Sequence, residues 1–266
     1  MRETLSLMLY LVRLRIRTRL EFRASLIIAW IAQAFGYASV FMSVWIILAR
    51  FRQLGGWSWP EMALLLGFHT LGYALGACFT FVQLRRMEEL VHSGEFDALL
   101  VRPVNPWAFL VFSGFNIEYG GHIALGFGLI VWALPQAGIV WSLPVVLQLV
   151  ASLASAAMIT ASVVTVIGAC ALVLGRARYL FGIYFDFWEL SRYPASIFAP
   201  SLQLALVTVI PLGYMAYVPV AALLGRPVPY LGSGAVAASL AAGPVCVLVA
   251  ITFWRFCLRR YQGAGG

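Results

Sequence analysis

The chain has 266 residues, of which 62% are hydrophobic and only 11% are charged, with a net charge of +8 and a mean hydropathy of +0.91. A soluble domain carries roughly a quarter of its residues as charges, so this composition indicates an integral membrane protein and excludes a soluble globular one. No pattern of alternating strands and turns recurs along the sequence. The spans are therefore predicted to be helices, which gives an all-α integral membrane fold rather than a β-barrel.

The basic residues exclude two kinds of chemistry, because all 18 of them are arginine and the sequence contains no lysine. A phosphate-binding P-loop and a Schiff-base enzyme both need a lysine, so neither an ATP-hydrolysing module nor amine catalysis is expected. We expect no cofactor and no metal in this chain, and no nucleic-acid partner. The four cysteines lie in or beside apolar runs and are expected to be buried thiols rather than disulfides.

Residues 1–24 precede the first apolar run and are strongly basic. The stretch "VRLRIRTRL" alternates apolar and basic residues, a period that taken alone is typical of a strand. A lone strand beside a membrane would leave its backbone groups unpaired. An interfacial helix, with arginines reaching toward the polar surface, is therefore predicted instead.

Six runs are long enough to cross a bilayer, which takes about 20 apolar residues in a helix. They cover residues 25–48, 62–84, 114–134, 142–174, 202–224 and 234–257 of a single transmembrane domain over residues 1–266. With the N-terminus in the cytosol, every arginine except Arg50, Arg52 and Arg226 falls on the cytosolic side. Because arginine is enriched in cytosolic loops, the sequence predicts a multi-pass protein with both termini in the cytosol.

A polar interruption, residues 85–106, separates the second and third runs and contains "HSGEFDALLVRPVNP". Apolar residues at i, i+3 and i+4 form a short stripe, charged residues occupy other faces, and a glycine and two prolines delimit the segment. These residues are Gly94, Glu95, Phe96, Asp97, Leu99, Leu100, Arg102, Pro103 and Pro106. The pattern is typical of a short amphipathic helix that rests on a membrane or a partner, and equally of a solvated connecting loop.

Glu118 and His122 stand four residues apart in "NIEYGGH", so on a helix they share one face. Ionisable residues inside a span are functional candidates, here for a substrate path or gate. A zinc site would need more protein ligands than this pair supplies, and a proton relay would need further ionisable groups. For His69, in the second run, a hydrogen bond between helices is expected rather than a ligand.

The second predicted cytosolic loop, Gly175–Pro200, carries Asp186, Glu189 and Arg192 at intervals of three residues. This spacing favours local ion pairs on one face of a solvated helix that precedes the fifth span. A contact with a partner protein is the alternative.

The fifth run contains Pro211 and Pro219, each of which removes a helix hydrogen bond, and Gly213 lies between them. Such breaks persist in lipid only where protein or water covers the freed carbonyl groups. The residues therefore predict an interrupted segment, either a kinked span or a span with irregular structure beside it.

Three ordered blocks, "SGEFDALLVRPVNP", "FWELSRYPASIF" and "VIPLGYMAYVPVAALLG", make nearly the whole chain resemble a known family. It is similar to the small six-span ABC-2 type permeases, the membrane subunits of type V ABC exporters. The resemblance implies a half-transporter in a bacterial cell (inner) membrane that pairs with an identical or related second permease. It also implies a separate ATPase subunit, which binds ATP and Mg, and membrane lipids as surroundings. The Gly94–Pro106 segment would couple the ATPase to the permease, and re-entrant helices after the fifth span would form an exit gate.

The expected function is therefore export of an amphipathic or hydrophobic molecule, such as a lipid, lipopeptide, drug or natural product, by a chain that is not itself an enzyme. An ion-coupled secondary carrier is the first alternative, although that class usually shows repeated, paired broken helices. An intramembrane enzyme that uses Glu118 and His122 is the second, and it would need further catalytic groups at the same depth.

Overall fold

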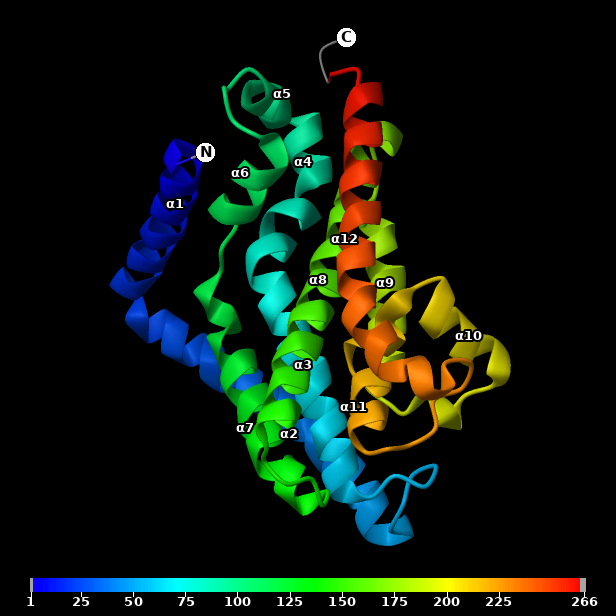
Figure 1. The fold of residues 1–266 in the computed structure, drawn as a ribbon. Helices are drawn as coiled ribbons and strands as arrows, with labels where there is room; N and C mark the ends of the chain where they lie inside the picture. The colour runs from blue at the N-terminus through cyan, green and yellow to red at the C-terminus, as the bar shows by residue number, and fades with distance from the viewer. Residues whose placement is uncertain (1, 264–266) are drawn as a thin grey trace.

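The computed structural model describes residues 2–263, and all the regular elements in this range are helices (Figure 1). In chain order they are α1 (Arg2–Glu21), α2 (Arg23–Phe51), α3 (Trp59–Arg85), α4 (Met87–His92), α5 (Glu95–Leu100), α6 (Pro106–Ser113), the 3₁₀ turn η1 (Ile117–Tyr119), α7 (Gly120–Gln136), α8 (Leu143–Leu174), α9 (Arg178–Leu190), η2 (Ala195–Ile197), α10 (Pro200–Thr208), η3 (Pro211–Met215), α11 (Tyr217–Leu223), η4 (Gly232–Gly234) and α12 (Ala235–Arg260).

Five segments of the described chain are long and apolar enough to cross a membrane. They are Arg23–Phe51, Trp59–His92, Ile117–Gln136, Leu143–Leu174 and Gly232–Arg260. They coincide with the first, second, third, fourth and sixth predicted spans. The all-helical, multi-pass membrane fold is therefore confirmed, and the fifth predicted span is not among these five segments.

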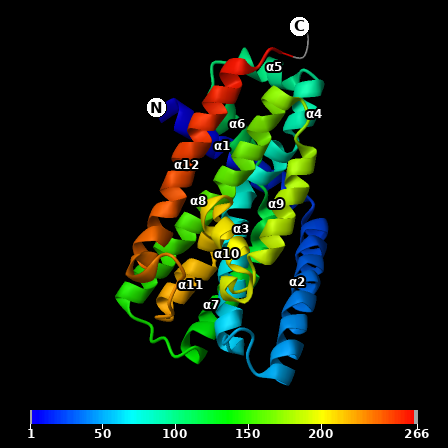
Figure 2. The same ribbon diagram turned by 90° about the vertical axis from the view of Figure 1, so that its right-hand side faces the viewer.

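The bundle is built around α3, in whose most apolar window 89% of the residues are buried. Helices α7 and α8 pack along α3, and α12 packs along α8 (Figure 2). Helix α2 lies at the periphery, with only 11% of its window buried. Because α2 is as apolar as a buried helix, its exposed surface suits lipid or another protein rather than water.

Small residues let the central helices approach closely. A Cβ atom added to Gly76 of α3 would lie 2.4 Å from the carbonyl oxygen of Ala157 and 2.7 Å from Cβ of Thr160, both in α8. At Gly126 of α7, an added Cβ would lie 2.9 Å from the backbone nitrogen of Leu71 in α3. Backbones in direct contact are a common way to hold helices together in lipid, where hydrophobic burial gives no driving force.

The basic N-terminal segment is helical, as predicted, and not a strand. Helix α1 packs beside α6, where Nε of Arg15 donates a hydrogen bond of 2.6 Å to the carbonyl oxygen of Ser113. Two of its apolar side chains, Leu9 and Tyr10, are more than half exposed.

The structure corrects the fifth predicted span. Residues 202–224 form α10, η3 and α11, of 9, 5 and 7 residues, none of them near the length that a crossing requires. Pro211 begins η3, and the chain reverses so tightly that a Cβ on Gly213 would lie 3.0 Å from the carbonyl oxygen of Leu206. Pro219 lies inside α11.

The segment Gly175–Pro200, predicted as a cytosolic loop, contains the 13-residue helix α9, which lies along the side of the bundle (Figure 2). At the start of α9, the carboxylate of Glu88 accepts hydrogen bonds from the backbone amides of Ala177 and Arg178, at 2.9 and 3.0 Å. After η2, Ile197 touches Gly55 in the α2–α3 loop, at the opposite end of α3 from Glu88. Residues 178–197 therefore pass from one end of the bundle to the other.

The two ends of the bundle differ. Helices α4 and α5 and the last turn of α12 meet at one end, uppermost in Figure 1, where Phe96 packs against Tyr261 with ring centroids 5.3 Å apart. The other end holds the loop before α3 and the turn after α11. There Arg226 makes an ion pair of 2.7 Å with Glu61 and a hydrogen bond of 2.9 Å to the carbonyl oxygen of Gly56.

Candidate functional site

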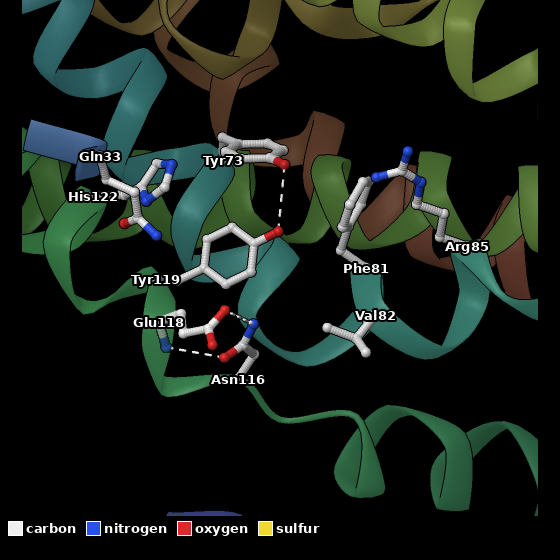
Figure 3. A pocket seen from close by; sticks show the side chains of 9 residues that line it. All are labelled: Gln33, Tyr73, Phe81, Val82, Arg85, Asn116, Glu118, Tyr119 and His122. Atoms are coloured by element: carbon white, nitrogen blue, oxygen red, sulfur yellow. Dashed lines mark hydrogen bonds between the residues drawn. The ribbon is translucent and has the colours of Figure 1, made fainter. Parts of the chain in front are cut away.

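A polar cavity of about 380 Å³ lies inside the bundle, between α2, α3 and the start of α7 (Figure 3). Its lining residues are Gln33, Tyr73, Phe81, Val82, Arg85, Asn116, Glu118, Tyr119 and His122. In a chain that is 62% hydrophobic, so many polar groups around one interior space mark the best candidate for a binding site or a path.

One wall of the cavity is an irregular stretch of chain between α6 and α7. The backbone amide of Asn116 donates to the carbonyl oxygen of Cys78 at 2.8 Å, which attaches the stretch to α3. The side-chain oxygen of Asn116 accepts from the amide of Glu118 at 3.0 Å and begins the turn η1. The break in the helix thus places the Glu118 carboxylate at the cavity instead of along a regular helix face.

The acid and the imidazole predicted as a pair both line the cavity, but they are turned in different directions (Figure 3). The Glu118 carboxylate forms an ion pair of 2.9 Å with Arg19 of α1 and accepts a hydrogen bond from Asn116. The His122 ring packs against Tyr37 and Tyr119, with centroids 4.8 and 5.3 Å apart. Among the described residues no hydrogen bond joins Glu118 to His122, so their role in a gate stays a prediction.

The cavity presents polar atoms that the protein itself leaves without partners. Nδ1 of His122 and Oε1 of Gln33 are buried and have no hydrogen-bond partner among residues 2–263. The hydroxyl groups of Tyr73 and Tyr119 stand 3.4 Å apart at the centre of the wall. Polar groups gathered around a cavity are typical of a site that fixes the orientation of a bound molecule.

A cation stands at the end of the cavity nearest α4. The guanidinium of Arg85 lies over the ring of Phe81, with 5.3 Å between Cζ and the ring centroid. With Glu118 on the opposite wall, the cavity carries one charge of each sign together with aromatic faces. This combination suits the polar part of an amphipathic molecule.

A second, apolar hollow of about 770 Å³ lies between α8, α9, α12 and the α10–η3 hairpin. Pro211 lines it, and Gly213 and Pro219 are buried close by in the hairpin and α11. The three residues predicted to act as a gate therefore belong to one compact unit beside an apolar space. Nothing in their packing tests whether they move, so the gate stays a prediction.

The predicted coupling segment forms the tip of the bundle end that carries α4 and α5. Gly94 has a φ of 73°, a conformation that glycine adopts without strain, and it begins α5. Phe96 and Leu99 of the predicted apolar stripe are buried within this chain. Asp97 is partly buried, and Pro106 is the first residue of α6, whose N-terminus Asn105 caps.

The rest of this segment faces outward. Leu100 is 37% exposed and Val101 is 84% exposed, and Glu95, Arg102 and Pro103 are exposed around them. An apolar tip with charges on both sides has the composition of a protein-binding patch.

The prediction for His69 is confirmed. Its Nε2 lies 3.0 Å from the carbonyl oxygen of Trp188 and 3.1 Å from the hydroxyl of Ser191, so α3 and α9 are joined through this ring. All four cysteines are free thiols, as predicted. Residues 2–263 contain no group of three His, Cys, Asp or Glu side chains that could hold a metal ion.

Sequence reasoning missed several cavity residues, notably Gln33, Asn116, Tyr119 and Arg85. Gln33 gives the clearest signal, because it is the one amide within the apolar part of α2. The others could not be assigned from spacing, since α2, α3 and η1 bring them together from distant parts of the chain.

Comparison with known proteins gives one result. The model of the family described as ABC-2 family transporter protein matches residues 35–265, from within α2 to beyond the end of α12. No curated protein and no solved structure matches the chain. The matched range includes the apolar hollow, the α4–α6 end, the α10–η3 hairpin and every residue that lines the polar cavity except Gln33. The chain therefore belongs to the ABC-2 family of transporters, as a multi-pass membrane component.

Proposed function

We propose that this chain is the permease subunit of an ATP-driven exporter, and that it moves an amphipathic or hydrophobic molecule across a bacterial cell membrane. The observation that carries the proposal is the pair of hollows, one polar and one apolar, in a member of the ABC-2 family. One is polar and aromatic and the other is almost wholly apolar. A molecule with a polar head and an apolar body matches the two surfaces together.

The motor in this proposal is a separate ATPase that binds ATP and Mg and docks on the exposed tip of the coupling segment. The tip faces away from the bundle and presents Leu100 and Val101 between Glu95 and Arg102. Phe96 supports it from below by packing on Trp254 and Tyr261 of the α12 end, with ring centroids 6.3 and 5.3 Å apart. A push on the tip would thus reach α12 through direct contact.

The sixth crossing of the membrane in this proposal is residues 178–197, followed by α10 and α11 as re-entrant helices from the outer face. With this assignment Arg50, Arg52 and Arg226 lie outside, Arg192 lies within the membrane, and the remaining arginines lie in the cytosol with both termini. The arginines therefore keep the distribution that predicted the orientation, except that Arg192 is assigned to the membrane instead of the cytosol.

A second permease, identical or related, is proposed to cover the face of α9. Asp186 and Glu189 are exposed partway along this helix, and the neighbouring α2 is apolar and exposed as well. Carboxylates at this depth are costly in lipid and stand almost always against protein or a water-filled space. A partner chain on this face would place protein against the two carboxylates and would form a water-filled path between the two copies.

The test uses two exposed valines in loops at opposite ends of the bundle. Val101→Asp places a charge on the proposed ATPase contact, and Val140→Asp, at a residue 81% exposed between α7 and α8, is the matched control. Purified from membranes of its natural host, the wild-type chain and the control should carry two permease chains and an ATPase with vanadate-sensitive turnover. Val101→Asp should retain the permease pair and lose the ATPase.

Two results would overturn the proposal. An undiminished ATPase complex in Val101→Asp would mean that the coupling segment is only a linker. Sustained uphill transport by the purified chain alone in liposomes, without an ATPase, would favour the ion-coupled carrier.

A further inference from the structure

A groove separate from the polar cavity opens between α1 and the α4–α6 region. We name it the α1–α5 groove, and its volume is about 480 Å³. Arg15 of α1, Arg86 after α3, Glu95 of α5 and Arg102 after α5 line it. The elements are distant in the chain, so the groove exists only because α1 folds back beside α6.

The charge in the groove is mainly positive and only partly neutralised. Arg86 is bonded to Glu89 at 2.9 and 3.0 Å. Arg15 uses Nε for the carbonyl oxygen of Ser113 and is not ion-paired in the described part of the chain, nor is Arg102. Two guanidinium groups therefore remain available for an anion, and their planar fork matches the oxygens of a phosphate.

The remaining walls are apolar, which a site for a free inorganic anion does not need. Leu11 and Leu14 of α1 line the groove, as do Phe109 and Leu110 of α6. The Arg102 guanidinium lies 5.5 Å from the centroid of the Phe109 ring, so the cationic and apolar walls meet at that point. A ligand that fits both kinds of wall has a phosphate and an attached hydrocarbon chain.

The position of the groove suits a lipid of the cytosolic leaflet. It lies at the end of the bundle proposed to face the cytosol, level with Arg86 just beyond the apolar length of α3. On α1, Leu9, Tyr10 and Leu20 are exposed by 60%, 61% and 49%, as expected of a helix in contact with the membrane interface.

We propose that the α1–α5 groove binds the phosphate of an anionic phospholipid, which remains in place as a resident ligand rather than being transported. Arg15 and Arg102 hold the phosphate, and the leucines of α1 and the aromatic ring of α6 hold the first part of the acyl chains. The bound lipid joins the N-terminal helix to the turn after α5, which belongs to the proposed coupling segment. This inference holds whichever molecule the two interior spaces carry.

The test measures lipid binding to the purified full-length chain by native mass spectrometry, with phosphatidylglycerol and phosphatidylcholine titrated separately. We expect retention of phosphatidylglycerol and weak retention of phosphatidylcholine. Arg15→Gln and Arg102→Gln should each weaken phosphatidylglycerol binding about fivefold, the usual effect of one basic residue near an anionic lipid. Arg17→Gln is the matched control, because Arg17 is exposed on the same helix and does not line the groove.

Two outcomes would overturn the proposal. An equal loss of binding in Arg17→Gln and Arg15→Gln would show diffuse attraction to a basic helix instead of a site. A competition arm with inorganic phosphate distinguishes the two sources of the phosphate group. Displacement of phosphatidylglycerol by inorganic phosphate at comparable concentration would show that the groove binds the soluble ion and that the apolar walls contribute nothing.

Discussion

Inside the bundle, one hydroxyl bridges a complete turn of a neighbouring helix. The Ser155 hydroxyl in α8 donates to the carbonyl oxygen of Ser239 at 2.6 Å and accepts from the amide of Gly243 at 2.9 Å. These two backbone groups stand four residues apart in α12, just before Pro244, which has no N–H group. A single side chain thus joins α8 to the backbone of α12 in the turn before its proline.

Ser155→Ala is therefore expected to lower the free energy of unfolding by about 1 kcal/mol, because it removes both hydrogen bonds that join α8 to α12. The matched control is Ser162→Ala in the same helix, whose hydroxyl bonds only to Met158 of its own turn. Thermal unfolding of the detergent-solubilised protein measures the difference. Equal melting temperatures for the two variants would show that the bridge contributes nothing.

At the same scale, the candidate site shows what spacing can and cannot predict. The four-residue interval between Glu118 and His122 correctly indicated a polar locus, since both line the cavity. It wrongly indicated a pair, because Asn116 starts a 3₁₀ turn there and Arg19 of α1 holds the carboxylate. The spacing of neighbouring residues cannot predict that ion pair, because Arg19 and Glu118 are 99 positions apart in the chain.

Among the elements, α3 and α8 form the contact on which the bundle depends, and Gly76 lies at its tightest point. A methyl group there would meet the Ala157 carbonyl oxygen at 2.4 Å, and a backbone atom of a helix cannot move away alone. We expect Gly76→Ala to separate the two helices and to destabilise the fold by about 1–3 kcal/mol, the usual cost of overpacking.

Gly128→Ala in α7 is the control, because no atom lies within 4 Å of the added methyl group and alanine favours the helix by up to about 1 kcal/mol. Unfolding in detergent should therefore occur at a lower temperature for Gly76→Ala and at an unchanged or higher one for Gly128→Ala. The opposite order would contradict the packing described for α3 and α8.

Hydropathy predicts five of the elements well, because each is one long apolar helix. It fails where an apolar stretch of sequence is broken into several short helices. Residues 202–224 are apolar enough for a span, yet Pro211 and the turn at Gly213 divide them into short pieces that other helices cover. For helix α9 the prediction errs in the opposite direction, because its charged residues suggest a loop between spans. Arg192, two residues after the end of this helix, is ion-paired with Glu189 and lies over the Trp188 ring at 5.3 Å, which lowers the cost of burying it.

At the scale of the whole molecule, the arginines predict an orientation of the bundle in the membrane. Arginines gather toward the end that carries α1, α4, α5 and the end of α12, and Arg50, Arg52 and Arg226 mark the other end. Arg192 is the exception, since it is 8% exposed and lies beside Ser191, which contacts His69 of α3. Counting the arginines in each loop cannot identify a buried arginine of this kind. The position of an arginine that is ion-paired inside the protein depends on packing and not on the side of the membrane.

The two topologies make opposite predictions for Ser196, which is exposed in η2. The sequence alone places Ser196 in a cytosolic loop. The proposed topology places it outside, because the next residue, Ile197, touches Gly55 at the end of the bundle proposed to face outward. In a variant whose four cysteines are replaced, Ser196→Cys should react with a membrane-impermeant maleimide on intact cells. Arg176→Cys, exposed before α9 at the other end, should react only after permeabilisation. If Ser196→Cys also required permeabilisation, residues 178–197 would not cross the membrane, and both the re-entrant hairpin and the six-crossing topology would have to be abandoned.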